Sequence, residues 1–165
     1  MMYIRKATLD DLSKIMSIYK IAQDFMIESG NPNQWGHNNP SEEKVKEDID
    51  KKNSYLVCNG EDIHGVFVIF KGIEPTYKHI ENGRWLNEDE YITIHRIASD
   101  GTQKGIFKFL IDYCKSKSEN IRIDTHHDNK IMQKLIERNG FQKCGRIYVT
   151  DGSPRIAYQW MNPLH

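Results

Sequence analysis

One stretch of the sequence combines the end of an apolar strand, a glycine-containing turn and the start of an apolar helix. Residues 94–107 hold Gly101, Lys104 and Gly105 in this turn. Backbone N–H groups at a helix N-terminus, together with the helix dipole, bind anions, and phosphate is the usual ligand. Glycine lets the backbone approach a ligand closely, and Lys104 adds a positive charge. An ordinary strand–helix turn has the same pattern, because the stretch matches neither a Walker A loop nor Gly-x-Gly-x-x-Gly.

The run His126-His127-Asp128 offers the side chains that bind zinc. Adjacent residues on a strand point to opposite faces, so we do not expect His126 and His127 to share one ion. No cysteine or further histidine stands at ligand spacing from them. We therefore predict no metal site, and a loop in which Asp128 or Asn129 caps the following helix.

Alternating strands and helices must position these groups. The patterns predict strands at 3–6, 55–58, 63–70, 91–99, 121–125, 141–149 and 155–160, and helices at 9–28, 41–51, 106–117 and from 128 or 129 to 139. The connection 72–90 is expected to be too polar for the core, with a short helix at 75–82; connections of this length are often functional. Strands joined by short turns should be antiparallel and those separated by helices parallel. The prediction is one α/β domain over residues 1–165, with a mixed sheet of about seven strands flanked by about four helices.

Composition narrows the function classes. The chain has 165 residues, of which 38% are hydrophobic, enough for a core and against a disordered protein. Lys+Arg and Asp+Glu are both 23, a balance that argues against a nucleic-acid binder. No run approaches the ~20 apolar residues that cross a bilayer, and the first residues lack the apolar stretch of a secretory signal, so we expect a cytoplasmic protein without a membrane partner. The three widely spaced cysteines imply no disulfide framework.

The element order and several short motifs resemble the GNAT family of acetyl-CoA-dependent N-acetyltransferases, over essentially the whole chain. The motifs are Ile4-Arg5-Lys6-Ala7-Thr8 before the first helix, the strand–loop–helix at 91–117, and the segment 129–141 with Asn129, Leu135 and Asn139-Gly140-Phe141. The resemblance implies a sheet whose central strands splay apart, with the pantetheine arm of the cofactor in the gap.

The resemblance also implies which residues hold acetyl-CoA. The backbone of the fourth strand would pair with pantetheine at Ile97, Ala98 and Ser99. The following loop would hold the pyrophosphate, and it comprises Gln103, Lys104, Gly105, Ile106 and Phe107. Asn129 would bind amides of the cofactor, a role compatible with capping a helix.

Two positions depart from the family pattern. The family loop commonly reads Arg/Gln-x-x-Gly-x-Gly/Ala, whereas here only Gly105 fits and Phe107 stands where a small residue is usual. Ile136 stands where the family often has a tyrosine that protonates the departing thiolate. These departures leave open a degenerate acyl-CoA-binding module, or a protein-interaction domain on the same fold.

Acetyl transfer to an amine requires a base, or an amine whose pKa the pocket lowers, because only the neutral amine attacks a thioester. His95 is the candidate base, since histidine titrates near neutrality; strand alternation would place it on one face with Thr93 and Ile97. Tyr148 is the candidate acid in place of the missing tyrosine. A histidine packed within the sheet and a core tyrosine are the alternatives.

Two further side chains bear on the acceptor. Trp35 lies in the loop between the first two helices, which borders the acceptor pocket in similar proteins, and it contacts either the substrate or the rim of the sheet. Arg155 follows a turn and could reach a carboxylate, although solvated arginines are more common.

The sequence thus predicts an N-acetyltransferase that moves an acetyl group from acetyl-CoA to a primary amine of a small molecule or peptide, by direct attack and without a metal. The sequence leaves the acceptor and the oligomeric state open, and a homodimer is compatible because sheet edges can pair.

Overall fold

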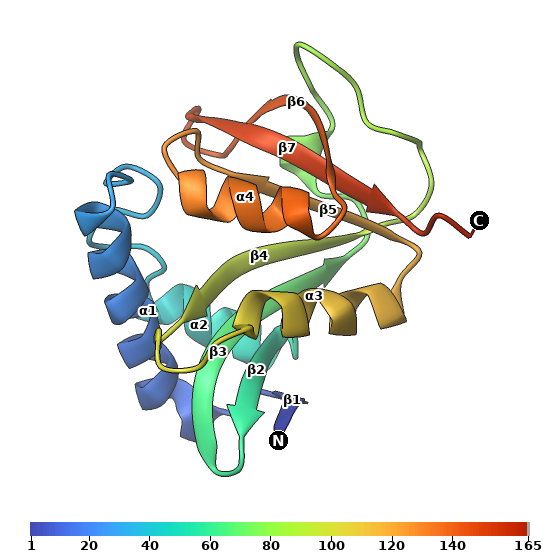
Figure 1. Cartoon of the computed structure of the whole chain (residues 1–165). Helices are drawn as coiled ribbons and strands as arrows, with labels where there is room; N and C mark the ends of the chain where they lie inside the picture. The colour runs from blue at the N-terminus through green and yellow to red at the C-terminus, as the bar shows by residue number, and fades with distance from the viewer. Residues whose placement is uncertain (165) are drawn as a thin grey trace.

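Seven strands form one mixed sheet in the order β1-β2-β3-β4-β5-β7-β6 in the computed structural model, which describes residues 1–164 (Figure 1). The strands are β1 (Met2–Lys6), β2 (Ser54–Asn59), β3 (Asp62–Lys71), β4 (Ile92–Ser99), β5 (Asn120–Thr125), β6 (Gln142–Tyr148) and β7 (Pro154–Met161). The helices are α1 (Leu12–Glu28), α2 (Glu42–Asp50), α3 (Ile106–Lys117) and α4 (Lys130–Arg138), with 3-10 turns at Leu9–Asp11 and Pro75–Tyr77. Within residues 1–164 only β4 and β5 pair in parallel. The expectation that helix-separated strands are parallel is wrong for β1 and β2, which pair antiparallel across α1 and α2. The predicted fold class is confirmed.

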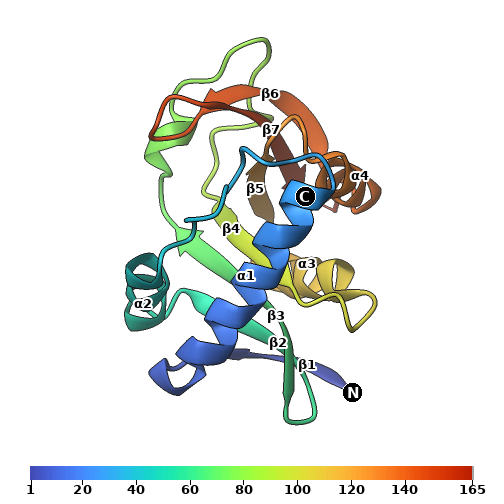
Figure 2. The same ribbon diagram turned by 90° about the vertical axis from the view of Figure 1, so that its left-hand side faces the viewer.

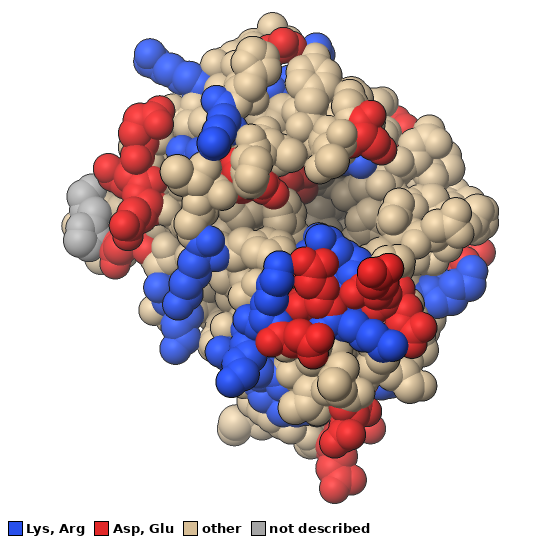
Figure 3. Space-filling view, turned by 180° about the vertical axis from the view of Figure 1, so that it is seen from behind, with Lys and Arg blue, Asp and Glu red and all other residues tan. Residues whose placement is uncertain are grey.

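Helices cover both faces of the sheet (Figure 2). One apolar core joins α1 and α2 to β2, β3 and β4, and the other joins α3 and α4 to the opposite face. None of the helices within residues 1–164 is long and apolar enough to cross a membrane. On the face opposite to the view of Figure 1, positive and negative side chains are mixed below a central hollow, and acidic side chains gather along the left edge (Figure 3).

Local signals account for most helix boundaries. The Ser41 side chain accepts a hydrogen bond from the N–H of Lys44 and caps α2, and Asn129 accepts one from the N–H of Met132 and caps α4. The predicted first helix begins as a separate 3-10 turn, with a capping box between Thr8 and Asp11.

A bulge in β4 overturns the predicted side-chain alternation. Arg96 has φ of +50°, and the register between β3 and β4 shifts at the same level. Ile97 therefore packs on the same core as Ile94, so His95 and Ile97 do not share a face. Beyond Thr93, β4 has no pairing with β5, because the two strands pair only at Ile92–Ile121 and Thr93–Arg122. The sheet is splayed as predicted.

The bulge is held by an ion pair with α2. Asp48 is 2% exposed, and its carboxylate accepts hydrogen bonds from Nε and Nη2 of Arg96 at 2.8 and 2.7 Å. The hydroxyl of buried Tyr19 donates to the Arg96 carbonyl at 2.8 Å, and burial raises the pKa of this tyrosine. The unusual backbone at Arg96 is thus fixed from two helices.

Replacing Asp48 with alanine is expected to lower the free energy of unfolding by about 3 kcal/mol, because the Arg96 guanidinium would lose its buried partner. Urea denaturation measures this change. Glu47→Ala on the same helix removes only exposed pairs with Lys44 and Lys51 and serves as the control. Equal changes for the two variants would contradict this role of Asp48.

The connection between β3 and β4 was predicted to be too polar for the core. In the structure it contributes to a small apolar core of its own. Tyr77 and Trp85 are 1% and 8% exposed and pack with Cys144, Ile147 and Ala157. The predicted helix at 75–82 is only the 3-10 turn Pro75–Tyr77. The two aromatic rings supply the apolar surface that holds this otherwise polar connection against the sheet.

This segment lies close against β6. Its Glu81 pairs with Arg146 through the backbone, and a Cβ on Gly83 would lie 1.8 Å from the Cys144 carbonyl oxygen. Only glycine fits this contact, so the path of the connection against β6 is fixed. The first residues of the connection lie beside β4 and β5.

Candidate functional site

Two cavities adjoin where β4 and β5 diverge. The first, of about 300 Å³, follows the gap between α1, α3 and α4; we call it the gap cavity. The second, of about 390 Å³, lies between the loop before α2 and the turn before β7; we call it the acceptor cavity. Met26, Ile97, Asn129 and Met132 line both. The two cavities therefore meet at these four residues, where the strands diverge.

The turn before α3 borders the outer end of the gap cavity. Gly101 and Gly105 both have φ of +77°, and a Cβ on either would meet nothing within 4 Å. The first N–H groups of α3 have no partner within the helix, and Lys104 is exposed beside them. The side chain of Gln103 is held by a hydrogen bond from Asn59 at 3.1 Å. This open cradle of N–H groups fits the pyrophosphate of a nucleotide cofactor.

The two departures from the family pattern lie in the core. Ile106 and Phe107, the first two residues of α3, are 5% and 8% exposed and pack into the core. The bulk of Phe107 therefore does not cover the outer surface of the turn. Its side chain instead forms part of the wall of the gap cavity. Ile136 is fully buried and lines neither cavity.

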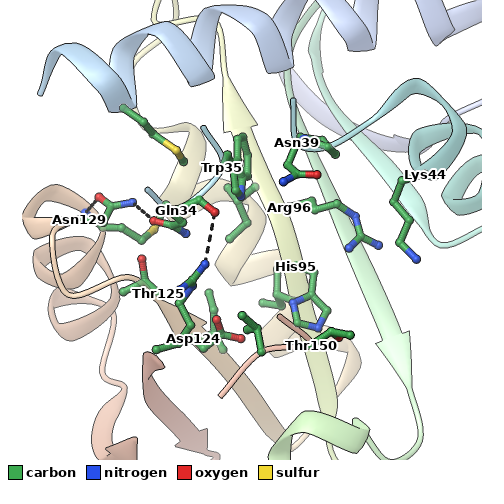
Figure 4. Close-up of a pocket in the computed structure, with 18 of the residues that line it drawn as sticks. Gln34, Trp35, Asn39, Lys44, His95, Arg96, Asp124, Thr125, Asn129 and Thr150 are labelled. Atoms are coloured by element: carbon green, nitrogen blue, oxygen red, sulfur yellow. Dashed lines mark hydrogen bonds between the residues drawn. The ribbon is translucent and has the colours of Figure 1, made fainter. Parts of the chain in front are cut away.

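The acceptor cavity is lined by polar side chains from β4 and β5, from the loop before α2 and α2 itself, from the start of α4, and from β7 and the turn before it (Figure 4). His95 from β4 is among them, and its Nε2 lies 3.0 Å from Oε1 of Glu74. The hydrogen bond with His95 lowers the pKa of Glu74, although burial opposes the shift. An ionised carboxylate only accepts, so Nε2 is the donor, and Nδ1 of a neutral His95 carries the lone pair.

Asp124 on β5 lines the cavity itself and accepts a hydrogen bond from the Tyr77 hydroxyl at 2.6 Å. Burial raises the pKa of Tyr77 well above its usual value, so Tyr77 remains a donor. Sequence reasoning missed both Glu74 and Tyr77. The only signal for them was the length of the connection that contains them.

The structure separates the other predicted site residues. Asn129 caps α4, donates to Oε1 of Gln34 at 3.0 Å and lines both cavities. Trp35 packs edge-to-face on Tyr19 of α1 and also lines the acceptor cavity, so its contact with the substrate remains a prediction. Tyr148 donates to Oε1 of Glu81 at 2.9 Å and lines neither cavity. The structure does not bring Tyr148 to His95.

His126 and His127 do not point to opposite sides, contrary to the prediction. β5 ends at Thr125, so strand alternation does not extend to them, and their rings stack with centroids 4.3 Å apart. Ligand atoms of these histidines and Asp128 lie within 4.8 Å of one another. Nδ1 of His126 accepts the N–H of Asp128 at 3.0 Å, a contact that closes the turn before α4. The absence of a metal remains a prediction.

No protein-family model matches the sequence, and no curated protein matches it. Solved structures do match. A GNAT-family acetyltransferase from Streptococcus agalactiae is 28% identical with a TM-score of 0.89, over 97% of this chain and 95% of that one. A putative acetyltransferase from Staphylococcus aureus is 26% identical with a TM-score of 0.69, over 96% and 98%.

A third match is the structure of a putative acetyltransferase from Salmonella typhimurium with its cofactor acetyl-CoA, at 13% identity and a TM-score of 0.61, over 99% and 95% of the two chains. At this identity the similarity shows the fold alone. The chain has the fold of the GNAT-family acetyltransferases over nearly its whole length.

Proposed function

We propose that the protein transfers an acetyl group from acetyl-CoA to a primary amine of a small molecule or peptide. One observation carries the proposal: the gap between β4 and β5 joins an open anion cradle to a polar cavity that contains His95. The likeness to solved acetyltransferases supports it. The structure with acetyl-CoA bound, although similar only in fold, suggests the donor.

The residues of the gap fit this donor. The backbone of Ile97, Ala98 and Ser99 has no strand partner on its β5 side and would pair with the pantetheine amides. The turn formed by residues 103–107 would hold the pyrophosphate on the first N–H groups of α3. Asn129 lies between the two cavities and would assist. When bound, acetyl-CoA supplies a thioester that an amine can attack.

His95 would take a proton from the acceptor amine through Nδ1, with Glu74 holding the imidazole through Nε2. The new amide C–N bond replaces the thioester C–S bond. Of the two protons that the ammonium form of the amine loses, one ends on the CoA thiol and the other reaches solvent through His95. No covalent bond to the protein is needed.

Glu74→Gln is expected to lower kcat/KM roughly tenfold at neutral pH and to move the acid limb of its pH profile to lower pH. Because the pKa of Glu74 is lowered, its carboxylate stays ionised at neutral pH. The carboxylate stops stabilising a charged imidazole only when the pH falls through the pKa of Glu74. Glutamine removes this charge and with it the electrostatic stabilisation of the imidazolium in the reaction. Glu81→Gln, which removes an exposed partner of His79, is the control. Identical profiles for Glu74→Gln and the wild type would contradict the role of Glu74.

A module that binds acyl-CoA without turnover is the second candidate function. Ile136 favours it, because no tyrosine hydroxyl occupies the position from which the family protonates the thiolate. Turnover with amines separates the two functions.

Calorimetric titration with acetyl-CoA, and with CoA for comparison, tests the cofactor site. We expect micromolar affinity, about −8 kcal/mol, and weaker binding of CoA if the protein recognises the acetyl group. No heat and no thermal stabilisation near millimolar ligand would contradict the proposal.

A further inference from the structure

We propose that the acceptor is an amine that also carries a carboxylate, as a free amino acid does, and that Arg155 binds this carboxylate. The inference rests on the acetyl transfer proposed for the same site. Arg155 lies at the start of β7, is 7% exposed and lines the acceptor cavity. A buried guanidinium facing a cavity is a strong binding group for a planar anion.

Arg155 differs from the other Lys and Arg side chains of the cavity in its partners. Arg96 pairs with Asp48 at 2.7 Å, and Lys44 pairs with Glu47 at 3.4 Å. Among residues 1–164, no carboxylate lies within 4.0 Å of the Arg155 guanidinium. A buried charge without a partner is costly, and a ligand carboxylate would relieve that cost.

The contacts of Arg155 orient it without neutralising it. Its Nη1 donates to Ser153 Oγ at 3.2 Å and to the Pro154 carbonyl at 2.9 Å, and Nη2 donates to the Gln34 carbonyl at 3.3 Å. All three acceptors are uncharged. Three of the five N–H donors of the guanidinium are used, which leaves Nε–H and one hydrogen on Nη2. Burial lowers the pKa of Arg155, but an arginine remains charged throughout the physiological range.

The same cavity holds an anion in the matching situation. Asp124 lies on β5, next to β7, and accepts a hydrogen bond from the neutral hydroxyl of Tyr77. The charge of Asp124 raises the pKa of Arg155, so the two groups attract each other without forming an ion pair within 4.0 Å. Asp151 also lines the cavity and its charge also raises the pKa of Arg155, but it is exposed in the turn before β7 and accepts two hydrogen bonds from Ser153. Arg155 and the half-buried Asp124 are complementary to a zwitterion: the ligand carboxylate at Arg155 and its ammonium at Asp124.

Two neighbouring groups fit this arrangement. Thr125 lines the cavity, and its buried Oγ1 has no hydrogen-bond partner among the described residues, so it is available to donate to the carboxylate. His95 faces the cavity from β4 and accepts the proton that the ammonium must lose before attack. Arg155 and Thr125 would thus bind the carboxylate of an amino acid, and Asp124 and His95 would act on its amine.

The test compares the twenty amino acids with their amides, as acceptors for the full-length protein with acetyl-CoA. The wild type should favour an amino acid over its own amide by ~10²-fold in kcat/KM. Arg155→Gln should abolish this preference and leave the rate with the amide within about threefold. Arg155→Lys should retain part of the preference, and Lys44→Gln, which removes the exposed cation of the cavity, should keep it. Thermal melting checks that each variant is folded.

The possible failures are distinguishable. If amides react as fast as the acids, or if Arg155→Gln keeps the preference, the carboxylate site is wrong and the proposed acetyl transfer stands. If no amine reacts, acetyl transfer fails, and calorimetry with N-acetyl amino acids and N-acetyl amino amides decides on Arg155 independently. Stronger binding of the acids by the wild type than by Arg155→Gln supports the site, and equal binding overturns it.

Discussion

His95→Ala is expected to lower kcat/KM for acetyl transfer by roughly 10²–10³-fold while leaving the affinity for acetyl-CoA within about twofold. His95 lines the acceptor cavity, whereas the backbone proposed to hold the cofactor begins at Ile97 beyond the Arg96 bulge. The loss should therefore appear in the rate of reaction with the amine. It should also shrink as pH rises, because a larger fraction of the amine is then neutral without help from a base.

Steady-state kinetics across a pH series measures this effect, with calorimetry to confirm cofactor binding. His79→Ala is the control, because His79 also contacts a glutamate, Glu81 at 3.1 Å, but lies exposed outside the acceptor cavity. If His95→Ala keeps the wild-type kcat/KM, or if its loss of kcat/KM is the same at every pH, then His95 only packs within the sheet.

Gly105→Glu is expected to raise the Kd for acetyl-CoA more than about 100-fold, a loss of about 2.7 kcal/mol. Three effects combine. The φ of +77° at Gly105 disfavours any residue with a Cβ, the new side chain would occupy the open space at the start of α3, and its negative charge would repel the pyrophosphate.

Gly60→Glu separates the cofactor effect from backbone strain. Gly60 lies in the hairpin turn between β2 and β3, has φ of +63° and likewise has open space around its Cβ position. Both variants should lose similar thermal stability, but only Gly105→Glu should lose acetyl-CoA binding in a calorimetric titration. Equal affinities in the two variants would mean that the turn before α3 is not the cofactor site.

The features predicted correctly from the sequence are those encoded by neighbouring residues. Ser41 marks the start of α2, Asn129 marks the start of α4, and the apolar spacing from Ile106 gives α3 its observed bounds. The turn at Asn59-Gly60 identifies the β2–β3 hairpin. These signals were sufficient for the fold class. They did not give the pairing of β1 with β2, which is antiparallel although two helices separate the strands, or the place of β7 between β5 and β6.

The features that were missed depend on contacts between distant residues. The φ of +50° at Arg96 is stabilised by Asp48 from α2 and Tyr19 from α1, and nothing near Arg96 in the sequence indicates it. This bulge is what placed His95 and Ile97 on different faces. Glu74 reaches His95 over a sequence separation of 21 residues, so periodicity and capping rules cannot detect the contact.

The candidate site was predicted unevenly for the same reason. The turn at 101–105 is a local motif, and the structure gives it the open backbone that the glycines suggested. Tyr148 was chosen for its chemistry on a late strand, but its hydroxyl is directed to Glu81 in the β3–β4 connection, whose path the sequence did not reveal. Side-chain direction at the edge of a sheet depends on such packing, which no local pattern encodes.

Turnover tests the central claim most directly. Purified protein, acetyl-CoA and a panel of amines are incubated, and CoA thiol release is measured together with the mass of the acceptor. Acetyl transfer predicts that thiol appears only when a suitable amine is present, in equal amount to an acceptor one acetyl group heavier. Tight binding of acetyl-CoA with no acetylated amine from the whole panel would contradict the claim and favour an acyl-CoA-binding module on the same fold.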